Sequence, residues 1–191
     1  KSNQITYYIK KKIITSIDKT IIELSNTHII KGSNITYDKK SRLFFSNKKA
    51  VITDINNNKL SMKSFSFSTA QKILTTKNAK LNDNKGNIYN VKDIKYNIKT
   101  NEILGKDLNL ILYDDNLDSN GSEYRFKGNS FFYNGNQTQI NKGVFTTCKK
   151  NDSCPPWLLS SKKIEHDKIK KRITYKNAWL KFYNIPVLYF P

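Results

Sequence analysis

The stretch "IKYNIKTNEILGKDLNLILYD", from Ile94 to Asp114, decides the fold because it holds two alternating apolar segments around one polar turn. Ile94 and Tyr96 alternate with polar residues before the turn, and Leu108 and Leu110 do so after it. Successive side chains of a β-strand point to opposite faces, so each segment places its apolar residues on one face. The stretch therefore predicts a strand, a turn and a second strand.

This pattern recurs five times along the chain. The first members of the apolar pairs before each turn are 30, 29, 37 and 33 residues apart, and the pairs are Ile35/Tyr37, Phe65/Phe67, Ile94/Tyr96, Phe131/Tyr133 and Ile164/His166. An apolar residue follows each first member by eight or nine positions: Leu43, Ile73, Ile103, Ile140 and Ile173. A third position comes 13 to 15 residues after the first member: Ala50, Ala79, Leu108, Val144 and Ala178. Two residues beyond it stand Ile52, Leu81, Leu110, Thr146 and Leu180. Repeats of this length, each unable to bury its own apolar row, are expected to stack on one another.

The composition also favours strands over helices. Asn, Thr, Ser and Ile are plentiful, Ala and Leu are scarce, and no proline occurs before Pro155. Such a chain disfavours helix and suits the sheet. We expect an all-β fold of stacked antiparallel strand repeats over residues 1–191. The strands would form one elongated β-jellyroll, or β-taco, whose two layers lie about 10 Å apart around an apolar interior groove. Residues 1–20 are expected to start the sheet as an edge segment.

The net charge of +19, with 34 Lys and Arg against 15 Asp and Glu, favours anionic partners. The lysines stand mostly singly, however, and form runs only at 10–12 and 168–172. A charge run is usually a solvated face. The excess therefore also fits a coding sequence that is merely rich in A and T.

No arrangement typical of catalysis stands out. The chain shows no Ser/His/Asp set, no phosphate-binding glycines and no recurring pair of carboxylates, so we expect no enzyme, no cofactor and no metal site. Four aspartates stand at turn positions, where Asp caps the backbone: Asp38, Asp54, Asp83 and Asp167. His166 takes the place of a repeat tyrosine, and His28 has no partner that the sequence reveals.

Two copies, "NITYDKKSRLFFSNKKAVITD" and "KIEHDKIKKRITYKNAWLKFY", together with the opening stretch, resemble the organic-solvent-tolerance-A repeat. The end of the chain, "GVFTTCKKNDSCPPWLLSSKKIEHDKIKKRITYKNAWLKFYNIPVLYFP", is similar to the segment that joins the periplasmic domain to the barrel in the LptD family of lipopolysaccharide-assembly proteins. The matching residues are Thr146, Thr147, Cys148, Trp157, His166, Asp167, Asn177, Ala178, Pro186, Tyr189 and Pro191. The Gly-Asn that usually precedes the second strand of a repeat is Lys48-Lys49 in one copy and Lys77-Asn78 in another.

This resemblance implies a periplasmic domain at the outer membrane of a Gram-negative bacterium. Such a domain receives lipopolysaccharide from an LptA-type bridge protein at its N-terminal edge and shields the acyl chains in its groove. It passes the lipid to a barrel that begins after residues 184–191 and that binds an LptE-type lipoprotein. The groove-lining residues would be Ile35, Tyr37, Leu43, Ile52, Phe65, Phe67, Ile73, Leu81, Ile94, Tyr96, Ile103, Leu110, Phe131, Tyr133, Ile140, Ile164, Ile173 and Leu180. The same rows also fit an ordinary close-packed core.

Cys148 and Cys154, in an expected loop at 143–163, are the only cysteines of the chain. Structural zinc needs four ligands, and the spacing does not match a Cys-x-x-Cys redox motif. An exported domain meets oxidising conditions, which favour a disulfide. We expect a Cys148–Cys154 bond, although the family resemblance equally allows pairing with cysteines of the barrel.

Two other functions stay open. A nucleic-acid-binding β protein would interleave aromatic residues with Lys and Arg on an exposed face, whereas the repeat aromatics are expected to point inward. A repeat protein that serves only as a scaffold would need no groove.

Overall fold

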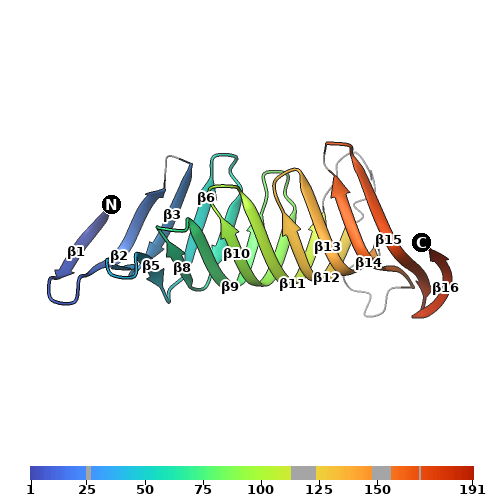
Figure 1. Ribbon diagram of the computed structural model, residues 1–191, viewed down its shortest axis with the longest axis horizontal. Coiled ribbons are helices and arrows are strands. Elements are labelled where there is room, and N and C mark those ends of the chain that lie inside the picture. Colours follow the sequence, from blue (N-terminus) through green and yellow to red (C-terminus); the bar gives the residue numbers. More distant parts are fainter. Residues whose placement is uncertain (25–26, 113–123, 148–155, 168) are drawn as a thin grey trace.

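The computed structural model describes residues 1–24, 27–112, 124–147, 156–167 and 169–191. In these residues the chain is all-β, and every strand belongs to one antiparallel sheet. Figure 1 shows an elongated molecule whose strands follow one another along the long axis, with the two termini at opposite ends. The strands are β1 (Ser2–Tyr8), β2 (Ile13–Leu24), β3 (His28–Ser33), β4 (Thr36–Asp38), β5 (Leu43–Ser46), β6 (Ala50–Asp54), β7 (Lys59–Met62), β8 (Phe65–Ser68), β9 (Ile73–Asn82), β10 (Ile88–Asn97), β11 (Glu102–Leu112), β12 (Tyr124–Tyr133), β13 (Gln137–Thr146), β14 (Trp157–Asp167), β15 (Arg172–Phe182) and β16 (Ile185–Phe190).

Each of the strands β9 to β15 bends once near its middle, and we call the line of these bends the crease. On either side of the bend every second residue is buried, but across it the step is three residues, as from Thr76 to Ala79 in β9 and from Val91 to Ile94 in β10. The extra residue lets both halves of a strand turn their buried side chains to the same interior. The sheet is therefore folded along the crease into two layers, as expected for a β-taco.

Left-handed residues mark the crease on alternate strands. Positive φ angles occur at Asn78 in β9, Asp107 in β11, Lys142 in β13 and Asn177 in β15. Asn and Asp are the non-glycine residues that adopt this conformation most readily. The strands β10, β12 and β14 bend without such a residue, so each pair of neighbouring strands contains one left-handed position at the crease.

The short strands are the two halves of bent strands that are interrupted at the crease. β3 continues into β4 through residues 34–35, β5 into β6 through 47–49, and β7 into β8 through 63–64. We call the layer that begins with β3, β6 and β7 the first layer and the layer that begins with β4, β5 and β8 the second layer. From β9 to β15 each bent strand contributes one half to each layer, as β9 does with Leu81 beside β7 and Leu74 beside β8. Both layers hydrogen-bond to β2 at one end and to β9 at the other, so these eight strands close into a ring around the crease links.

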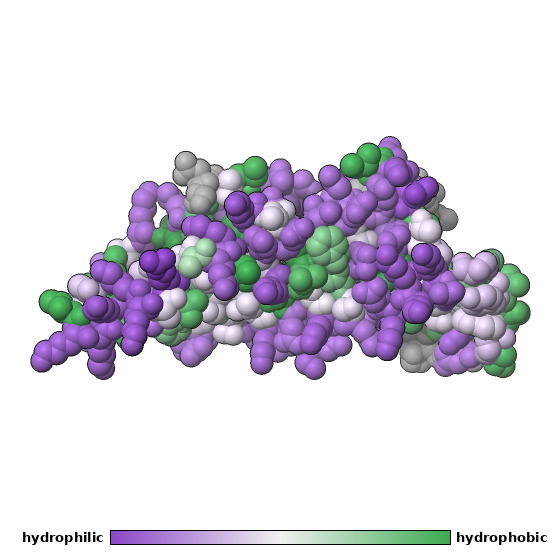
Figure 2. All heavy atoms as spheres, viewed as in Figure 1, coloured by the Kyte–Doolittle hydropathy of each residue, from purple (hydrophilic) through white to green (hydrophobic). Residues whose placement is uncertain are grey.

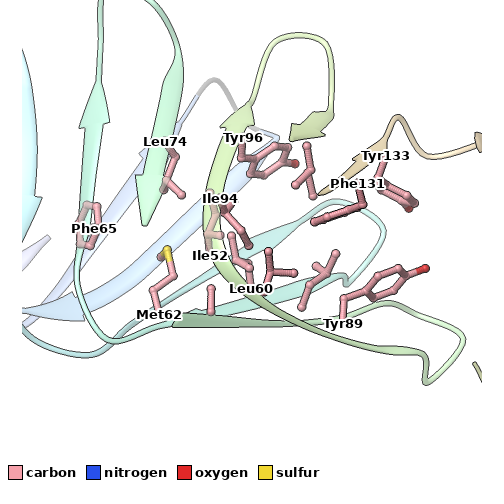
Figure 3. Close-up of a cluster of buried hydrophobic side chains, with 14 of the residues drawn as sticks. Ile52, Leu60, Met62, Phe65, Leu74, Tyr89, Ile94, Tyr96, Phe131 and Tyr133 are labelled. Atoms are coloured by element: carbon pink, nitrogen blue, oxygen red, sulfur yellow. The ribbon is translucent and has the colours of Figure 1, made fainter. Parts of the chain in front are cut away.

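The core lies between the two layers. Figure 3 shows Ile52, Leu60 and Met62 of the first layer directed into the same interior as Ile94 and Tyr96 of the second. Contacts between layers include the rings of Tyr89 and Tyr133, 6.1 Å apart, and those of Phe145 and Tyr175, also 6.1 Å apart. Hydrophobic burial, at about 25 cal/mol per Å², is what holds the layers together.

Two predicted inward positions are wrong by one residue. Leu43 and Ile73 are half-buried and lie outside the core cluster, whereas the neighbouring Phe44 packs against that cluster and Leu74 is wholly buried. In both places two apolar residues stand side by side, so their alternation does not fix the face, and a slip of one residue reverses it.

In the fourth repeat, the inward positions of the second strand begin one residue earlier than the sequence spacing predicts. Gly143 and Phe145 face the core in this repeat, in place of Val144. Thr146 is buried as well, and its hydroxyl donates to the backbone carbonyl of Trp157 at 2.9 Å. The ring of Phe145 packs on that of Phe126 with centroids 4.7 Å apart.

The expected segments at the ends are partly strands. Within 143–163, residues 143–146 belong to β13 and residues 157–163 to β14, while Cys148 and Cys154 lie outside the described residues. Residues 185–190 form β16, which pairs with β15. Residues 1–20 comprise β1 and part of β2, and β1 pairs with β2 alone among the described strands, so it is an edge strand as expected.

Hydrophilic side chains cover most of the visible surface in Figure 2, and hydrophobic ones show at both ends and in smaller groups between them. At the β16 end they include Tyr183, Ile185, Val187, Leu188 and Phe190. At the β1 end they include Ile5, Tyr7, Tyr8 and Ile9.

Candidate functional site

The interior opens between two rows of turns, which we call the lips. The first lip joins strand ends of the first layer and includes the turns at 54–58 and 83–87. The second lip joins those of the second layer and includes the turns at 38–42, 68–72, 97–101 and 134–137. The crease closes the opposite side, so any ligand that reaches the interior from the side passes between the lips.

Aspartates and asparagines shape the lips. The Asp54 carboxylate accepts hydrogen bonds from the backbone N–H groups of Asn56 and Asn58, both at 2.9 Å, and Asp83 does the same for Lys85 at 3.0 Å and Asn87 at 2.9 Å. These contacts confirm the expected turn-capping role, which Asp38 and Asp167 share. The hydrogen bond from the Ser41 hydroxyl lowers the pKa of Asp38.

A cavity of about 380 Å³, which we call the mouth cavity, lies between the lips near the middle of the molecule. Its aliphatic floor is formed by Ile52, Leu60, Leu81 and Ile103. Tyr96 and Tyr133 line it as well, and Figure 3 shows both rings beside the core. Its rim carries the turn residues Asn56, Asn58, Asn84, Lys85, Asn101, Asn134 and Asn136. An apolar floor under a rim of amides suits an amphipathic ligand.

A short polar chain crosses from one layer to the other at this cavity. The Nε2 atom of His28, in the first layer, lies 2.6 Å from the hydroxyl of Tyr96, in the second, and that hydroxyl donates to Oδ1 of Asn101 at 3.1 Å. Burial lowers the pKa of His28, against the smaller opposite effect of Asp54. Burial likewise raises the pKa of Tyr96, so both groups are neutral near pH 7. The partner of Nε2 of His28 could not be found by reading the sequence, because Tyr96 lies 68 positions away in the chain.

A second buried polar group lies at the first lip. The Asp83 carboxylate accepts from the Asn87 amide at 2.8 Å and lies 3.5 Å from the hydroxyl of Tyr89. Burial is the main reason that the pKa of Tyr89 rises well above its ordinary value, and burial also raises that of Tyr133 to about 12. These tyrosines therefore carry no charge at neutral pH.

A cavity of about 310 Å³, which we call the end cavity, opens where the sheet begins. It lies between β1 and β2 on one side and β4 and β5 on the other, and its apolar lining includes Ile5, Ile14, Ile35, Tyr37 and Phe44. The rings of Tyr37 and Phe44 stack with centroids 4.3 Å apart. The apolar interior is thus accessible at the N-terminal end as well as between the lips.

Most of the predicted groove residues belong to one buried interior. The buried ones are Ile35, Ile52, Phe65, Phe67, Leu81, Ile94, Tyr96, Ile103, Leu110, Phe131, Tyr133, Ile140 and Ile164. Tyr37, Ile173 and Leu180 are half-buried. Leu43 and Ile73 are the two that the structure replaces with Phe44 and Leu74.

Sequence reasoning missed further interior residues because it followed only one strand pair per repeat. The missed ones include Leu60, Met62, Tyr89, Val91 and Phe126. Their signal is the step pattern of two, three and two residues, as in Tyr89, Val91, Ile94 and Tyr96. This pattern marks a bent strand, whereas we searched for straight ones.

In the described ranges, no group of three or more His, Cys, Asp or Glu residues is placed to hold a metal ion. That part of the chain also has no helix that is long and apolar enough to span a membrane.

No protein-family model matches this chain, and a search of curated proteins found no match either.

Proposed function

We propose that this chain is a periplasmic lipid-shielding domain of the LptD type, which receives lipopolysaccharide and conducts its acyl chains toward an outer-membrane barrel. One observation carries the proposal: a single apolar interior runs through the stacked repeats and is accessible both at the end cavity and at the mouth cavity. The sequence motifs described above support the same reading.

The energetics suit transport. Each methylene group that leaves water for an apolar interior gains about 0.8 kcal/mol. The interior is lined by similar aliphatic and aromatic side chains from one repeat to the next, so an acyl chain gains about the same amount wherever it lies. A uniform lining holds the chain without fixing it at one place.

The crease and the lips offer different amounts of room. On the inner side of the crease, the Phe131 ring fills the space beside Gly105, and Ile164 fills that beside Gly143. The mouth cavity lies at the lips instead. An acyl chain is therefore expected to lie on the lip side of the interior, with its polar head between the turns.

Photo-crosslinking in cells that produce lipopolysaccharide tests the proposal. A photoreactive residue is placed at Phe44, which lines the end cavity, or at Tyr133, which lines the mouth cavity. The adjacent Phe45 and Phe132 are matched controls, because they are aromatic residues of the same strands that point to the outer face. Crosslinks from Phe44 and Tyr133 alone are expected. Equal crosslinking at the outward positions, or none at any position of the folded protein, would refute the shielding role.

The edge strand β1 is the proposed docking site for an LptA-type bridge protein. An unpaired edge offers main-chain hydrogen bonds to a strand of a partner, and exposed Ile5, Tyr7 and Tyr8 add apolar contact area. Deleting residues 1–8 is expected to abolish binding of the bridge protein and to leave β2 paired with β3 and β4. Circular dichroism checks the fold, and unchanged binding by the folded deletion variant would rule out this docking site.

Nucleic-acid binding receives less support. Of the repeat aromatics Tyr37, Phe67, Tyr96 and Tyr133, the last three are buried and Tyr37 is half-buried, so they offer no exposed surface for stacked bases. If no lipid crosslink forms, a scaffold role becomes the next hypothesis.

A further inference from the structure

We infer that the mouth cavity is a glycolipid site, in which an alkyl chain occupies the aliphatic floor and a saccharide head binds the asparagine rim. This deepens the proposed function, and it rests on that function only for the identity of the natural ligand. The inference adds a recognition element to a lining that would otherwise hold any alkyl chain.

The rim presents amide groups that the protein itself does not use. The side chains of Asn56, Asn84 and Asn136 form no hydrogen bond within the described structure. Toward the part of the chain that the structure describes, Asn101 and Asn134 use only their carbonyl oxygens, which accept from the Tyr96 hydroxyl and from backbone N–H groups, and their NH₂ groups have no partner there. Each free amide offers donors and an acceptor close together, which is what the hydroxyl groups of a sugar require.

These amides come from both lips. Asn56 and Asn84 stand on the first lip, and Asn134 and Asn136 stand on the second. A head group between the lips can therefore be held from two sides. The turns that carry the amides are fixed by their own hydrogen bonds, such as that from the Asn84 N–H to Oδ1 of Asn58 at 2.9 Å. Binding a sugar here orders few additional groups, which limits its entropic cost.

The charge at the rim selects among polar heads. Among the described residues that line the cavity, Lys85 is the only lysine or arginine, and the Asp54 carboxylate is occupied by its turn. A head recognised mainly through phosphate would need several Arg or Lys side chains. An amide-rich rim with one lysine fits a polyhydroxylated head better.

The aliphatic floor determines where the alkyl chain of the ligand lies. Ile52, Leu60, Leu81 and Ile103 are buried residues of both layers, and the polar chain from His28 to Tyr96 crosses beside them. The alkyl chain therefore lies against the aliphatic floor while the head stays at the level of the turns. A sugar without an alkyl chain lacks the hydrophobic part of this binding energy.

Dodecyl maltoside below its micelle concentration is a suitable probe, with dodecylphosphocholine as a head-group control of equal chain length. Binding to the whole chain is followed by two-dimensional amide NMR. We expect dodecyl maltoside to bind more tightly than dodecylphosphocholine and to shift the amide signals of Asn84, Gly135 and Asn136. Equal affinity for the two detergents, or maltoside shifts that avoid the rim, would overturn the inference.

The double variant Asn84→Ala/Asn136→Ala removes one amide from each lip, at positions with ordinary φ angles. It is expected to weaken maltoside binding about tenfold and to leave dodecylphosphocholine binding unchanged. The matched control is Asn90→Ala/Asn109→Ala, an exposed cross-strand pair on the outer face of β10 and β11, which is expected to bind like the wild type. Unchanged maltoside affinity in the rim variant would contradict saccharide recognition.

These results are separable from the transport proposal. Lipopolysaccharide crosslinks at Phe44 and Tyr133, together with an insensitive rim variant, would leave transport standing and remove the saccharide site. Rim-dependent maltoside binding without any lipopolysaccharide crosslink would keep the glycolipid site and remove the transport role.

Discussion

Gly105, Gly128 and Gly143 lie on the inner side of the crease, where a side chain of the neighbouring strand occupies the space that a Cβ atom would need. A Cβ at Gly105 would lie 2.1 Å from Cε1 of Phe131, and one at Gly128 would lie 2.1 Å from Cγ2 of Ile140. None of the three glycines has a positive φ angle. They are therefore required by packing and not by backbone conformation.

Gly105→Ala is expected to lower the free energy of unfolding by about 1–3 kcal/mol, because the added methyl overpacks a filled core. Urea denaturation measures the effect. Lys106→Ala, on the exposed face of the same strand, is the matched control and is expected to change stability by less than about 0.5 kcal/mol. Equal effects of the two substitutions would show that the crease interior has room to relax.

Stability is expected to fall as the pH drops below about 6.5, because burial lowers the pKa of His28. In that range the unfolded chain takes up a proton that the folded chain does not, so protonation favours unfolding. His28→Gln is expected to flatten the dependence of the unfolding free energy on pH between 7 and 5. Tyr96→Phe keeps His28 buried and is expected to retain the slope. A His28→Gln variant with the wild-type slope would exclude His28 as the cause.

At the scale of the strand, the bend is the element that turns one sheet into two layers. It combines a three-residue step between buried positions with a left-handed residue on alternate strands. Three of the four left-handed crease residues in β9 to β15 are Asn or Asp, and the fourth is Lys142 with a φ of 48°. Lysine has no local hydrogen bond to offset the cost of this conformation.

Lys142→Asn is therefore expected to raise the free energy of unfolding by about 0.5–1 kcal/mol. Thermal and urea denaturation measure the change. Lys162→Asn is the control, because Lys162 is an exposed crease residue of the adjacent strand β14 with an ordinary φ angle, and it is expected to be neutral. A stability gain in both variants would point to reduced charge and not to relieved backbone strain.

Much of the strand pattern could be predicted from the sequence, and the failures have a common cause. Alternation located Ile35, Phe67 and Ile94 in the interior, since polar residues on both sides fix the face of each. It failed at Leu43 and Ile73, where the next residue is equally apolar. The mouth cavity could not be predicted, because its lining residues come from strands and turns that only the folding of the sheet brings together.

At the scale of the whole molecule, charge opposes compactness. The net charge is +19, and the described residues contain three ion pairs: Lys1–Glu23, Lys92–Asp107 and Lys163–Glu165. All three are substantially exposed to solvent, where such pairs contribute little. In the paired strands β14 and β15, Lys163 and Lys176 stand directly opposite each other. Repulsion among the lysines is thus largely uncompensated.

Sodium chloride is consequently expected to stabilise the fold, with the thermal midpoint rising between about 0.01 M and 0.15 M as the Debye length falls from about 30 Å to 8 Å. Differential scanning calorimetry follows the midpoint. Sucrose at matched osmolality is the control, because it leaves charge interactions unscreened. A midpoint that falls with salt would mean that attractive pairs dominate the surface.

The number of bent strands sets the length of the molecule. Among the described strands from β9 onward, each bent strand pairs only with its neighbours in the chain, apart from the pairing of β9 with β7. Inserting one hairpin, two bent strands at a spacing of about 4.8 Å, would therefore lengthen the molecule by about 10 Å and leave both ends unchanged. A fold of this kind can therefore be matched to the distance it has to span by gaining or losing whole hairpins.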